Sequence, residues 1–308
     1  MNILVTGGSG FIGRNIVKIL KEEGNTVGTY DIKDKNSESD YHIMADIRNL
    51  KMLEKACSGI DYVFHLAAVT SPPEFENFTG EGYEVNVIGT YNVLAASTKN
   101  SVKRVILASS SSIYGDIKQA AVETHLPKNY SNFYPMTKII NEMTARLISK
   151  YGLETVSLRY FNTYGAGENS KGDYSSVIWK FIDAIRNNKK PIIFGDGTQS
   201  RDFIYVEDSA KASVLAMKNG TPGEAYNVGT GKSTDFNTVF QIVKEEMGYQ
   251  GQPEYVPNPL KSYQTFTLAD ITKTMGELKF GPRYDIRDGV KKMIEETSNI
   301  GKNNSKST

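Results

Sequence analysis

The sequence predicts an α/β fold in which a doubly wound parallel sheet carries a smaller, mostly C-terminal α/β lobe. Between Ile3 and about Asn162, short runs of β-branched and aliphatic residues alternate with longer segments of helical period. The strand-like runs are ILVTG, TVGTYDI, YVFHLAA, RVILASS and TVSLRYF. They are almost entirely apolar, as expected of parallel strands that are buried on both faces. Residues 1–162 are therefore expected to form one domain around this sheet.

Beyond Asn162 the pattern changes to connections rich in glycine, proline and aromatic residues. Isolated helices are expected there at Ser176–Asn187, Val206–Met217 and Phe236–Met247. The short runs PIIFG and AYNVG could extend the main sheet or begin a separate small one. We expect a lobe over residues 163–300, with some segments returning to the main sheet. Residues 301–308 are polar and are expected to form a disordered tail.

The composition excludes several classes of protein. The 36 Lys and Arg residues nearly balance the 35 Asp and Glu residues, without a long run of like charge, so a nucleic-acid partner is not expected. The single cysteine, Cys57, cannot form an internal disulfide and has no companions at metal-ligand spacing, which predicts a reducing compartment and no metal site. The sequence enters a glycine loop at Thr6 and has no apolar run approaching the ~20 residues that span a bilayer. These features predict a cytoplasmic protein without a signal peptide or membrane segment.

A glycine loop, TGGSGFIG, runs from Thr6 to Gly13 between the first strand and the first helix. Glycines at these positions allow a tight turn and a close approach of the backbone to a pyrophosphate, while the helix N-terminus offers unpaired N–H groups to the anion. The second strand ends at Asp31, about 20 residues downstream, where a carboxylate can bind the adenosine ribose. This context predicts a Rossmann-type domain that binds NAD. Asp31 would repel the additional phosphate of NADP, but Lys33 could compensate and leaves NADP open.

The segment YPMTK places Tyr134 and Lys138 four residues apart at the start of an expected helix over Tyr134–Tyr151. Residues at this spacing share one helix face, so the ammonium can favour the phenolate form of a side chain whose ordinary pKa is about 10. A phenolate can take a proton from a hydroxyl group. The same spacing also occurs in ordinary surface pairs, so the segment alone leaves both interpretations open. The expected helix also carries an apolar stripe formed by Ile139, Ile140, Met143, Leu147 and Ile148.

Further motifs occur in a characteristic order along the chain. They are HLAA at His65–Ala68, VNVIGT at Val85–Thr90, SSSSIYG at Ser109–Gly115, LRYFN at Leu158–Asn162 and RDFIYVED at Arg201–Asp208. Together with TGGSGFIG and YPMTK, they resemble the extended short-chain dehydrogenase/reductase family, and most closely its UDP-galactose 4-epimerase branch. The resemblance extends from Asn2 to about Ile294 and implies an NAD-dependent enzyme that acts on a nucleotide-diphosphate sugar, most simply a UDP-linked one.

The resemblance also implies the roles of individual residues. Ser110 would bind the reacting sugar hydroxyl, Tyr134 would act as catalytic base and acid, and Lys138 would bind the nicotinamide ribose and lower the tyrosine pKa. The implied cofactor site contains Tyr134 and Lys138 together with Gly7, Gly10, Phe11, Ile12, Gly13, Asp31, Asp46, Ile47, Ala67 and Asn86. The implied substrate site contains Ser110 and Tyr134 together with Thr70, Ser111, Ser112, Asn162, Phe194, Arg201, Lys261 and Thr267.

Four of these positions have alternative interpretations or depart from the family. Arg201 could instead form a surface ion pair with Asp202 or Asp208, and Asp46 could be an ordinary loop residue. Thr70 stands where a lysine is usual in the epimerases, and Lys261 stands near the usual position of a second arginine but lacks the planar fork of a guanidinium. Thr267 resembles the family's size gate for the sugar, and a residue this small would leave room for an N-acetyl group.

The serine motif bears on the reaction. Family members that eliminate or decarboxylate carry carboxylates there, whereas this chain has Ser111 and Ser112. The resemblance therefore implies epimerisation: transient oxidation at carbon 4 of the sugar, rotation of the keto sugar and return of the hydride. UDP-glucose and UDP-galactose are the expected substrates, with UDP-GlcNAc and UDP-GalNAc as an extension. A keto-sugar reductase, another nucleotide-sugar oxidoreductase, a UDP-glucuronate epimerase and a non-catalytic dinucleotide-binding protein are the alternatives.

The resemblance implies a homodimer as well. Its interface would form by packing the expected helices Gly82–Lys99 and Tyr134–Tyr151 into a four-helix bundle. The apolar residues on either helix could equally belong to an ordinary core.

Overall fold

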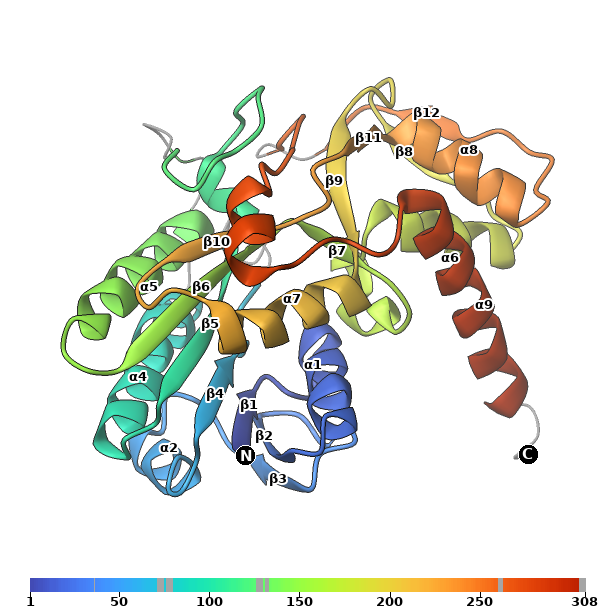
Figure 1. Cartoon of the computed structure of the whole chain (residues 1–308). Coiled ribbons are helices and arrows are strands. Elements are labelled where there is room, and N and C mark those ends of the chain that lie inside the picture. The colour runs from blue at the N-terminus through green and yellow to red at the C-terminus, as the bar shows by residue number, and fades with distance from the viewer. Residues whose placement is uncertain are drawn as a thin grey trace.

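The central feature of the computed structural model is a seven-stranded, entirely parallel sheet (Figure 1). The structure describes residues 1–35, 37–70, 75, 80–125, 130, 133–259 and 263–304, without the side chains of residues 170, 173 and 299–304. The strands, given in spatial order, are β10 (Ala225–Val228), β6 (Glu154–Tyr160), β5 (Arg104–Ser110), β4 (Tyr62–His65), β1 (Asn2–Thr6), β2 (Thr26–Asp31) and β3 (Tyr41–Met44). The predicted fold class is confirmed.

Helices cover both faces of this sheet (Figure 1). One face packs against α1 (Phe11–Glu22) and α7 (Val206–Asn219), and the other against α2 (Leu50–Ala56), α4 (Thr90–Lys99) and α5 (Phe133–Ser149). Because successive strand residues point to opposite faces, Val5 belongs to the first core and its neighbour Leu4 to the second. Both side chains are fully buried, which explains the unbroken apolar runs in the sequence.

A smaller lobe lies beside the carboxyl ends of the strands (Figure 1). It contains a three-stranded sheet of β11 (Ser233–Asp235), β9 (Ser200–Tyr205) and β7 (Asn162–Tyr164), and a two-stranded sheet of β8 (Ile192–Phe194) and β12 (Glu254–Val256). Its helices are α6 (Val177–Arg186), α8 (Phe236–Glu246) and α9 (Ile286–Asn304). Phe181 and Phe240 meet edge to face in its core, with ring centroids 5.8 Å apart.

The two ambiguous apolar runs become strands of different sheets. AYNVG becomes β10 and extends the main sheet, whereas PIIFG becomes β8 of the small two-stranded sheet. Helix α7, from the same half of the chain, packs against α1 on the main sheet. The domain boundary between residues 162 and 163 stays a prediction. The range 163–300 predicted for the lobe includes β10 and α7, which belong to the main sheet and its helical cover.

Two expectations about helices are wrong in part. The continuous helix expected at Gly82–Lys99 consists of α3 (Glu81–Tyr83), the π-helix η2 (Glu84–Gly89) and α4. Helix α9 continues to Asn304, so residues 301–304 are helical rather than disordered, while residues 305–308 lie outside the described part of the chain. The remaining short helices are η3 (Ser111–Tyr114), η4 (Glu168–Tyr174) and η5 (Thr274–Leu278). In the described residues, no helix combines the length and apolar character needed to cross a membrane.

We predict that Gly13→Ala destabilises the fold, because a methyl group at this position would overlap the carbonyl oxygen of Gly7 and approach the backbone of Gly8. Overpacking of this kind costs about 1–3 kcal/mol. The measurement is the free energy of unfolding of the protein without cofactor. The matched control is Gly276→Ala, since a methyl group there meets no atom within 4 Å. Equal stabilities of the two variants would contradict the predicted role of Gly13.

Candidate functional site

The glycine loop between β1 and α1 forms a cradle at the carboxyl edge of the sheet. Gly7 has a φ of +70°, and a Cβ atom on it would lie 2.6 Å from the backbone nitrogen of Ala67. The Gly7 N–H donates to the Tyr30 carbonyl at 2.9 Å, and the Gly10 N–H donates to the Gly7 carbonyl at 3.0 Å. No side chain caps α1, whose first residues include Phe11, Ile12 and Gly13. The cradle and the uncapped helix N-terminus fit a dinucleotide pyrophosphate.

Asp31 lies at the end of β2 and faces this loop. Its Oδ2 accepts a hydrogen bond from the Ser9 N–H at 3.0 Å, and its Oδ1 accepts one from the Lys33 N–H at 3.0 Å. The side chain is buried. The carboxylate is thus held against the glycine loop, where the predicted contact with a ribose would have to occur.

Asp46 and Ile47 follow β3. The Asp46 carboxylate accepts hydrogen bonds from Arg48 Nη2 at 2.6 Å and from Arg48 Nε at 3.0 Å. These hydrogen bonds lower the pKa of Asp46. Ile47 is buried against Gly89. The predicted cofactor contacts of both residues stay predictions.

Asn86, in the π-helix, holds the loop that follows β4. Its Oδ1 accepts from the Val69 N–H at 2.9 Å, and its Nδ2 donates to the Val69 carbonyl at 2.9 Å. The same Nδ2 donates to Thr137 Oγ1 at 3.2 Å. Asn86 therefore links the loop after β4 to α5. Its predicted contact with the cofactor stays a prediction.

His65 is the last residue of β4 and precedes this loop. Its ring nitrogens lie 2.7 Å from Thr6 Oγ1 and 2.9 Å from Thr90 Oγ1. Burial lowers the pKa of His65 to about 3, and the positive charge of Lys138 contributes to the shift. The imidazole is therefore neutral near pH 7, so it adds no second cation beside Lys138.

Tyr134 and Lys138 lie on the first turns of α5, both buried. The Lys138 Nζ is 5.8 Å from the centroid of the Tyr134 ring and donates to the Ala108 carbonyl at 3.0 Å. Burial lowers the pKa of Lys138 to about 8, against the opposing effect of the Glu142 charge. The Tyr134 ring also packs 5.6 Å from that of Phe75. The predicted pair is therefore a buried cation and phenol rather than a surface pair.

The serine motif begins with the last two residues of β5 and continues into η3. Ser110 caps the short helix η3, and its Oγ accepts from the Ser112 N–H at 3.1 Å. Ser111 is buried. The buried Ser112 hydroxyl has no hydrogen-bond partner among the described residues. The structure places Ser110 at the same sheet edge as Lys138, because Lys138 contacts Ala108 on the same strand.

Two cavities are lined mostly by residues of the lobe. One, of about 240 Å³, is lined by Asn162, Thr163, Glu168, Lys171, Tyr174, Ser176, Val177, Arg201, Phe203 and Phe236. The other, of about 410 Å³, has Phe194, Gln199, Asn258 and Tyr263 among its lining residues. The predicted substrate residues Asn162, Phe194 and Arg201 thus line these cavities.

Arg201 is buried and lines the smaller cavity. Its guanidinium carbon is 5.6 Å from the ring centroid of Phe236 and 5.0 Å from that of Tyr263. The group donates to the carbonyl of Ser200 at 2.9 Å and to that of Gln264. Burial lowers the pKa of Arg201.

The alternative interpretation of Arg201 as a surface ion pair is wrong. The Asp202 carboxylate accepts N–H groups of Thr230, Gly231 and Ala269, and the Asp208 carboxylate accepts those of Arg283 and Tyr284. Both acids are therefore committed to the backbone. Arg201 remains a buried cation facing a cavity, which is a suitable site for an anion.

Thr267 lies beside Asn162. Its Oγ1 accepts from Asn162 Nδ2 at 3.0 Å and from the Asp202 N–H at 3.1 Å. Thr70 is exposed at the end of a described segment, and Lys261 lies outside the described residues. Thr267 therefore lies behind Asn162, which lines the smaller cavity, whereas Thr70 lines neither cavity.

Lys171 and Glu168 are site residues that the sequence did not reveal. The Lys171 Nζ lies 2.9 Å from Glu168 Oε1 and 4.1 Å from the centroid of the Phe11 ring, the first residue of α1. Glu168 also accepts from the Ser176 N–H and hydroxyl at the start of α6. Lys171 thus stands between the glycine loop and the cavity. Their spacing of three residues was the only sequence signal, and it is typical of many surface pairs.

No group of three or more His, Cys, Asp or Glu side chains in the described part of the chain could hold a metal ion. Cys57 is buried and free, and burial raises the pKa of its thiol to about 11.

Comparisons with known proteins place this geometry in a family. Residues 3–229 match the model of the NAD dependent epimerase/dehydratase family, which is more than half of the chain. The chain belongs to the NAD-dependent epimerase/dehydratase family. The chain is also 32% identical over 324 residues to the UDP-glucose 4-epimerase of Halalkalibacterium halodurans, and the match covers 97% of this chain and 95% of that protein.

Solved structures of family members have the same fold. The UDP-glucose 4-epimerase of Thermotoga maritima with UDP-glucose superimposes with a TM-score of 0.92 at 33% identity, covering 97% of this chain and 99% of that one. The UDP-N-acetylglucosamine 4-epimerase of Methanobrevibacter ruminantium, in complex with UDP-N-acetylmuramic acid, gives a TM-score of 0.91 at 31% identity and covers 97% and 98% of the two chains. The expected family is thus confirmed, and NAD is its cofactor.

We predict that Asp31→Ala weakens NAD binding about tenfold or more and narrows the preference for NAD over NADP. The substitution removes both hydrogen-bond acceptors and the negative charge, and hydrogen bonds to charged groups contribute about 1.5–3 kcal/mol. The measurement is the Kd of each cofactor by calorimetry. Asp31→Asn is the matched control, because it retains the size of the side chain and one acceptor but not the charge. An unchanged ratio of the two affinities in both variants would show that Asp31 does not select the cofactor.

Proposed function

We propose that this chain is an NAD-dependent 4-epimerase of UDP-linked sugars. The observation that supports it is the meeting of three features at one sheet edge: the glycine cradle, the buried Tyr134–Lys138 pair beside Ser110, and the cavity with Arg201. The full-length similarity to UDP-glucose and UDP-N-acetylglucosamine 4-epimerases supports the same reaction.

Tyr134, Ser110 and Lys138 have different roles in the proposed reaction. Tyr134 takes the proton of the sugar hydroxyl at carbon 4 and later returns it, and Ser110 binds the same oxygen. Lys138 stabilises the phenolate, since its ammonium is held in a buried setting where its charge acts strongly. NAD, which the glycine cradle and Asp31 would hold, would supply the hydride acceptor and donor for carbon 4.

Arg201 and Lys171 are the cations that line the smaller cavity. A diphosphate placed there would meet a buried guanidinium on one side and an ammonium on the other, which suits a nucleotide-diphosphate sugar. Lys171 thereby offers positive charge that the sequence interpretation assigned to Lys261. The larger cavity, next to Phe194 and Tyr263, offers aromatic surface for the base.

We further propose that the sugar site accepts N-acetylated as well as plain hexoses. The short Thr267 side chain is buried next to Asn162, so no large side chain fills this part of the wall. A relative that shares the fold over nearly its whole length is a UDP-N-acetylglucosamine 4-epimerase. A hexuronic acid sugar remains an alternative substrate in the assay described next.

We predict that the purified protein interconverts UDP-glucose and UDP-galactose without added cofactor and releases NAD on denaturation. Tyr134→Phe should fold and bind NAD yet lose kcat by about 100-fold or more, because the ring still packs while the proton-transfer group is absent. The assay follows UDP-glucose, UDP-GlcNAc and UDP-glucuronate in parallel. Turnover that requires stoichiometric NADH or NADPH would identify a reductase instead. Residual activity of Tyr134→Phe within twofold of the wild type would remove Tyr134 from its role.

We also propose that the protein is a cytoplasmic homodimer formed through α4 and α5. The polar face of α5, with Thr137, Lys138 and Asn141, is the buried one, whereas Met143 and Leu147 are 67% and 54% exposed. Tyr91 on α4 is 56% exposed. Large apolar side chains gathered on two neighbouring helices are typical of an interface, and a second copy of this chain fits because both helices occur in it.

We predict that Met143→Glu shifts the protein from dimer to monomer, because it places an unpaired charge in an apolar interface. The mass in solution, measured by sedimentation at several concentrations, tests this. Met275→Glu is the matched control, since Met275 is 51% exposed on η5, away from α4 and α5. A wild-type protein that sediments as a monomer would overturn the proposed dimer.

A further inference from the structure

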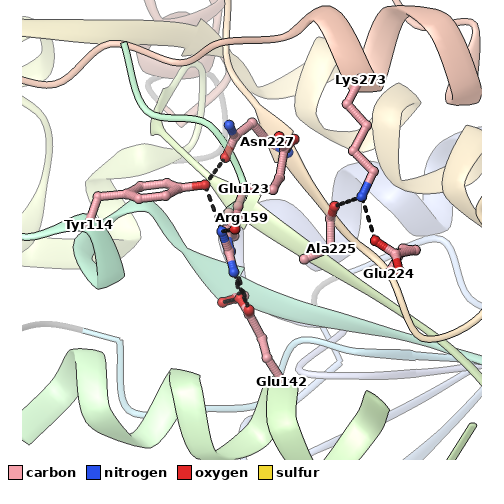
Figure 2. Close-up of polar contacts among 9 residues, drawn as sticks. Tyr114, Glu123, Glu142, Arg159, Glu224, Ala225, Asn227 and Lys273 are labelled. Atoms are coloured by element: carbon pink, nitrogen blue, oxygen red, sulfur yellow. Dashed lines mark hydrogen bonds and ion pairs between the residues drawn. The ribbon is translucent and has the colours of Figure 1, made fainter. Parts of the chain in front are cut away.

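A buried ion pair lies one helical turn beyond Lys138. The Glu142 carboxylate accepts hydrogen bonds from Arg159 Nη2 at 2.7 Å and from Arg159 Nε at 3.0 Å (Figure 2). The exposed fractions of the two side chains are 12% for Glu142 and 6% for Arg159. The Ser109 hydroxyl also donates to Glu142 Oε1. The carboxylate is thus held by β6 and β5 at once.

The hydrogen-bond network continues from this pair to Tyr114 and Asn227 (Figure 2). Arg159 Nη1 donates to the Tyr114 hydroxyl at 2.8 Å, and that hydroxyl donates to Asn227 Oδ1 at 2.6 Å. Asn227 Nδ2 donates to the Ala121 carbonyl at 2.7 Å and to the Asp270 carbonyl at 3.0 Å. The network therefore joins α5 to the segment that follows Thr267.

The spacing along α5 aligns this pair with the proposed proton-transfer residues. Tyr134, Lys138 and Glu142 are four residues apart and share one helix face. Lys138 binds the carbonyl of Ala108, and Glu142 binds the hydroxyl of Ser109, the next residue of β5. Two successive contacts therefore fix the helix against the strand whose next residue is Ser110.

We propose that Glu142 is a positioning residue of the active site, which anchors the Tyr134–Lys138 helix to the end of β5 and places a negative charge one turn beyond the buried ammonium. The proposal rests on the proposed function of Tyr134 and Lys138. Arg159 makes this arrangement possible, because without it the buried carboxylate would lack its counter-ion.

The charge of Glu142 has a consequence for pH dependence. Lys138 faces Tyr134 and Glu142 on its own helix and the neutral His65 on β4. Glu142 in turn faces Arg159 and Tyr114, with Tyr130 and Glu123 nearby. Burial lowers the pKa of Lys138 to about 8 and Glu142 opposes that shift. Removing the Glu142 charge therefore lowers the Lys138 pKa further, so the ammonium is lost at a lower pH.

The test is Glu142→Gln, which retains the size of the side chain and removes its charge. The Lys138 protonation midpoint, followed by NMR with isotope-labelled lysine and assigned with Lys138→Arg, is expected to fall by about one unit. The alkaline limb of the pH profile of kcat should move to lower pH by a similar amount. KM for the UDP-sugar should stay within about twofold of the wild-type value. Glu224→Gln is the control, because it removes a Glu from an ion pair of 2.7 Å with Lys273 outside this network (Figure 2). Glu224→Gln should change neither the Lys138 protonation midpoint nor the alkaline limb of the pH profile of kcat.

Two further variants keep the test decisive if Glu142→Gln does not fold. Glu142→Asp retains the charge. The pH at which kcat falls on the alkaline side should therefore stay within a few tenths of a pH unit of the wild-type value, although kcat itself is lower. Ser109→Ala removes one anchoring hydrogen bond and should lower kcat without moving the limb. A loss of thermal stability with an unchanged Lys138 midpoint would overturn the proposal, as would an equal shift in the Asp variant. A wild-type enzyme that epimerises no UDP-sugar would instead refute the proposed function, while the Lys138 midpoint still reports on Glu142.

Discussion

The burial of the Lys138 ammonium at the carboxyl edge of the sheet is the constraint on which the rest of the site depends. A charge removed from water is costly unless its surroundings compensate. Here the Ala108 carbonyl accepts a hydrogen bond from it, and Glu142 adds a negative charge on the same helix. His65 stays neutral and so avoids a second buried cation. Burial also places the ammonium near the Tyr134 ring in a medium of low dielectric, where a charge is most effective.

The parallel sheet brings the other groups to the same place. Strands β1, β2, β4 and β5 run in one direction, so the glycine loop, Asp31, the loop after His65 and the serine motif all follow carboxyl ends. Ligands of open α/β sheets bind outside these ends. Hydrogen bonds of Asn86 to Val69 and Thr137 link the loop after β4 to α5. The cofactor cradle and the Tyr134–Lys138 pair are consequently parts of one connected structure.

The lobe completes the site from the other side. Asn162, at the start of β7, binds Thr267, and Thr267 in turn binds the backbone of Asp202 next to Arg201. Lys171 contacts the ring of Phe11 on α1, so the lobe touches the glycine loop directly. The proposed substrate cavity and the proposed cofactor site are therefore in contact through Lys171 and Phe11.

Much of the site was predictable because its signals are local. The glycine loop, the strand end at Asp31 and the spacing of Tyr134 and Lys138 each depend on neighbouring residues or on one helical turn, and the family resemblance assigned Ser110 and Arg201. The partners of Glu142 and Glu168, by contrast, gave no signal that distinguishes them from surface pairs. Glu142 and Arg159 are 17 residues apart, beyond the reach of one helical turn, and meet only because α5 packs on β5 and β6.

The sequence by itself determined the alternation of elements, the glycine loop and the four-residue spacing of Tyr134 and Lys138, because periodicity and short-range spacing encode these features, while the family resemblance supplied the proposed role of that pair. Only the tertiary structure decided that PIIFG and AYNVG enter different sheets and that α5 buries its polar face and exposes Met143 and Leu147. It also decided that Arg201 faces a cavity rather than Asp202 or Asp208. The physical reason is that burial and charge pairing depend on which surfaces meet, and those surfaces come from segments distant in the chain.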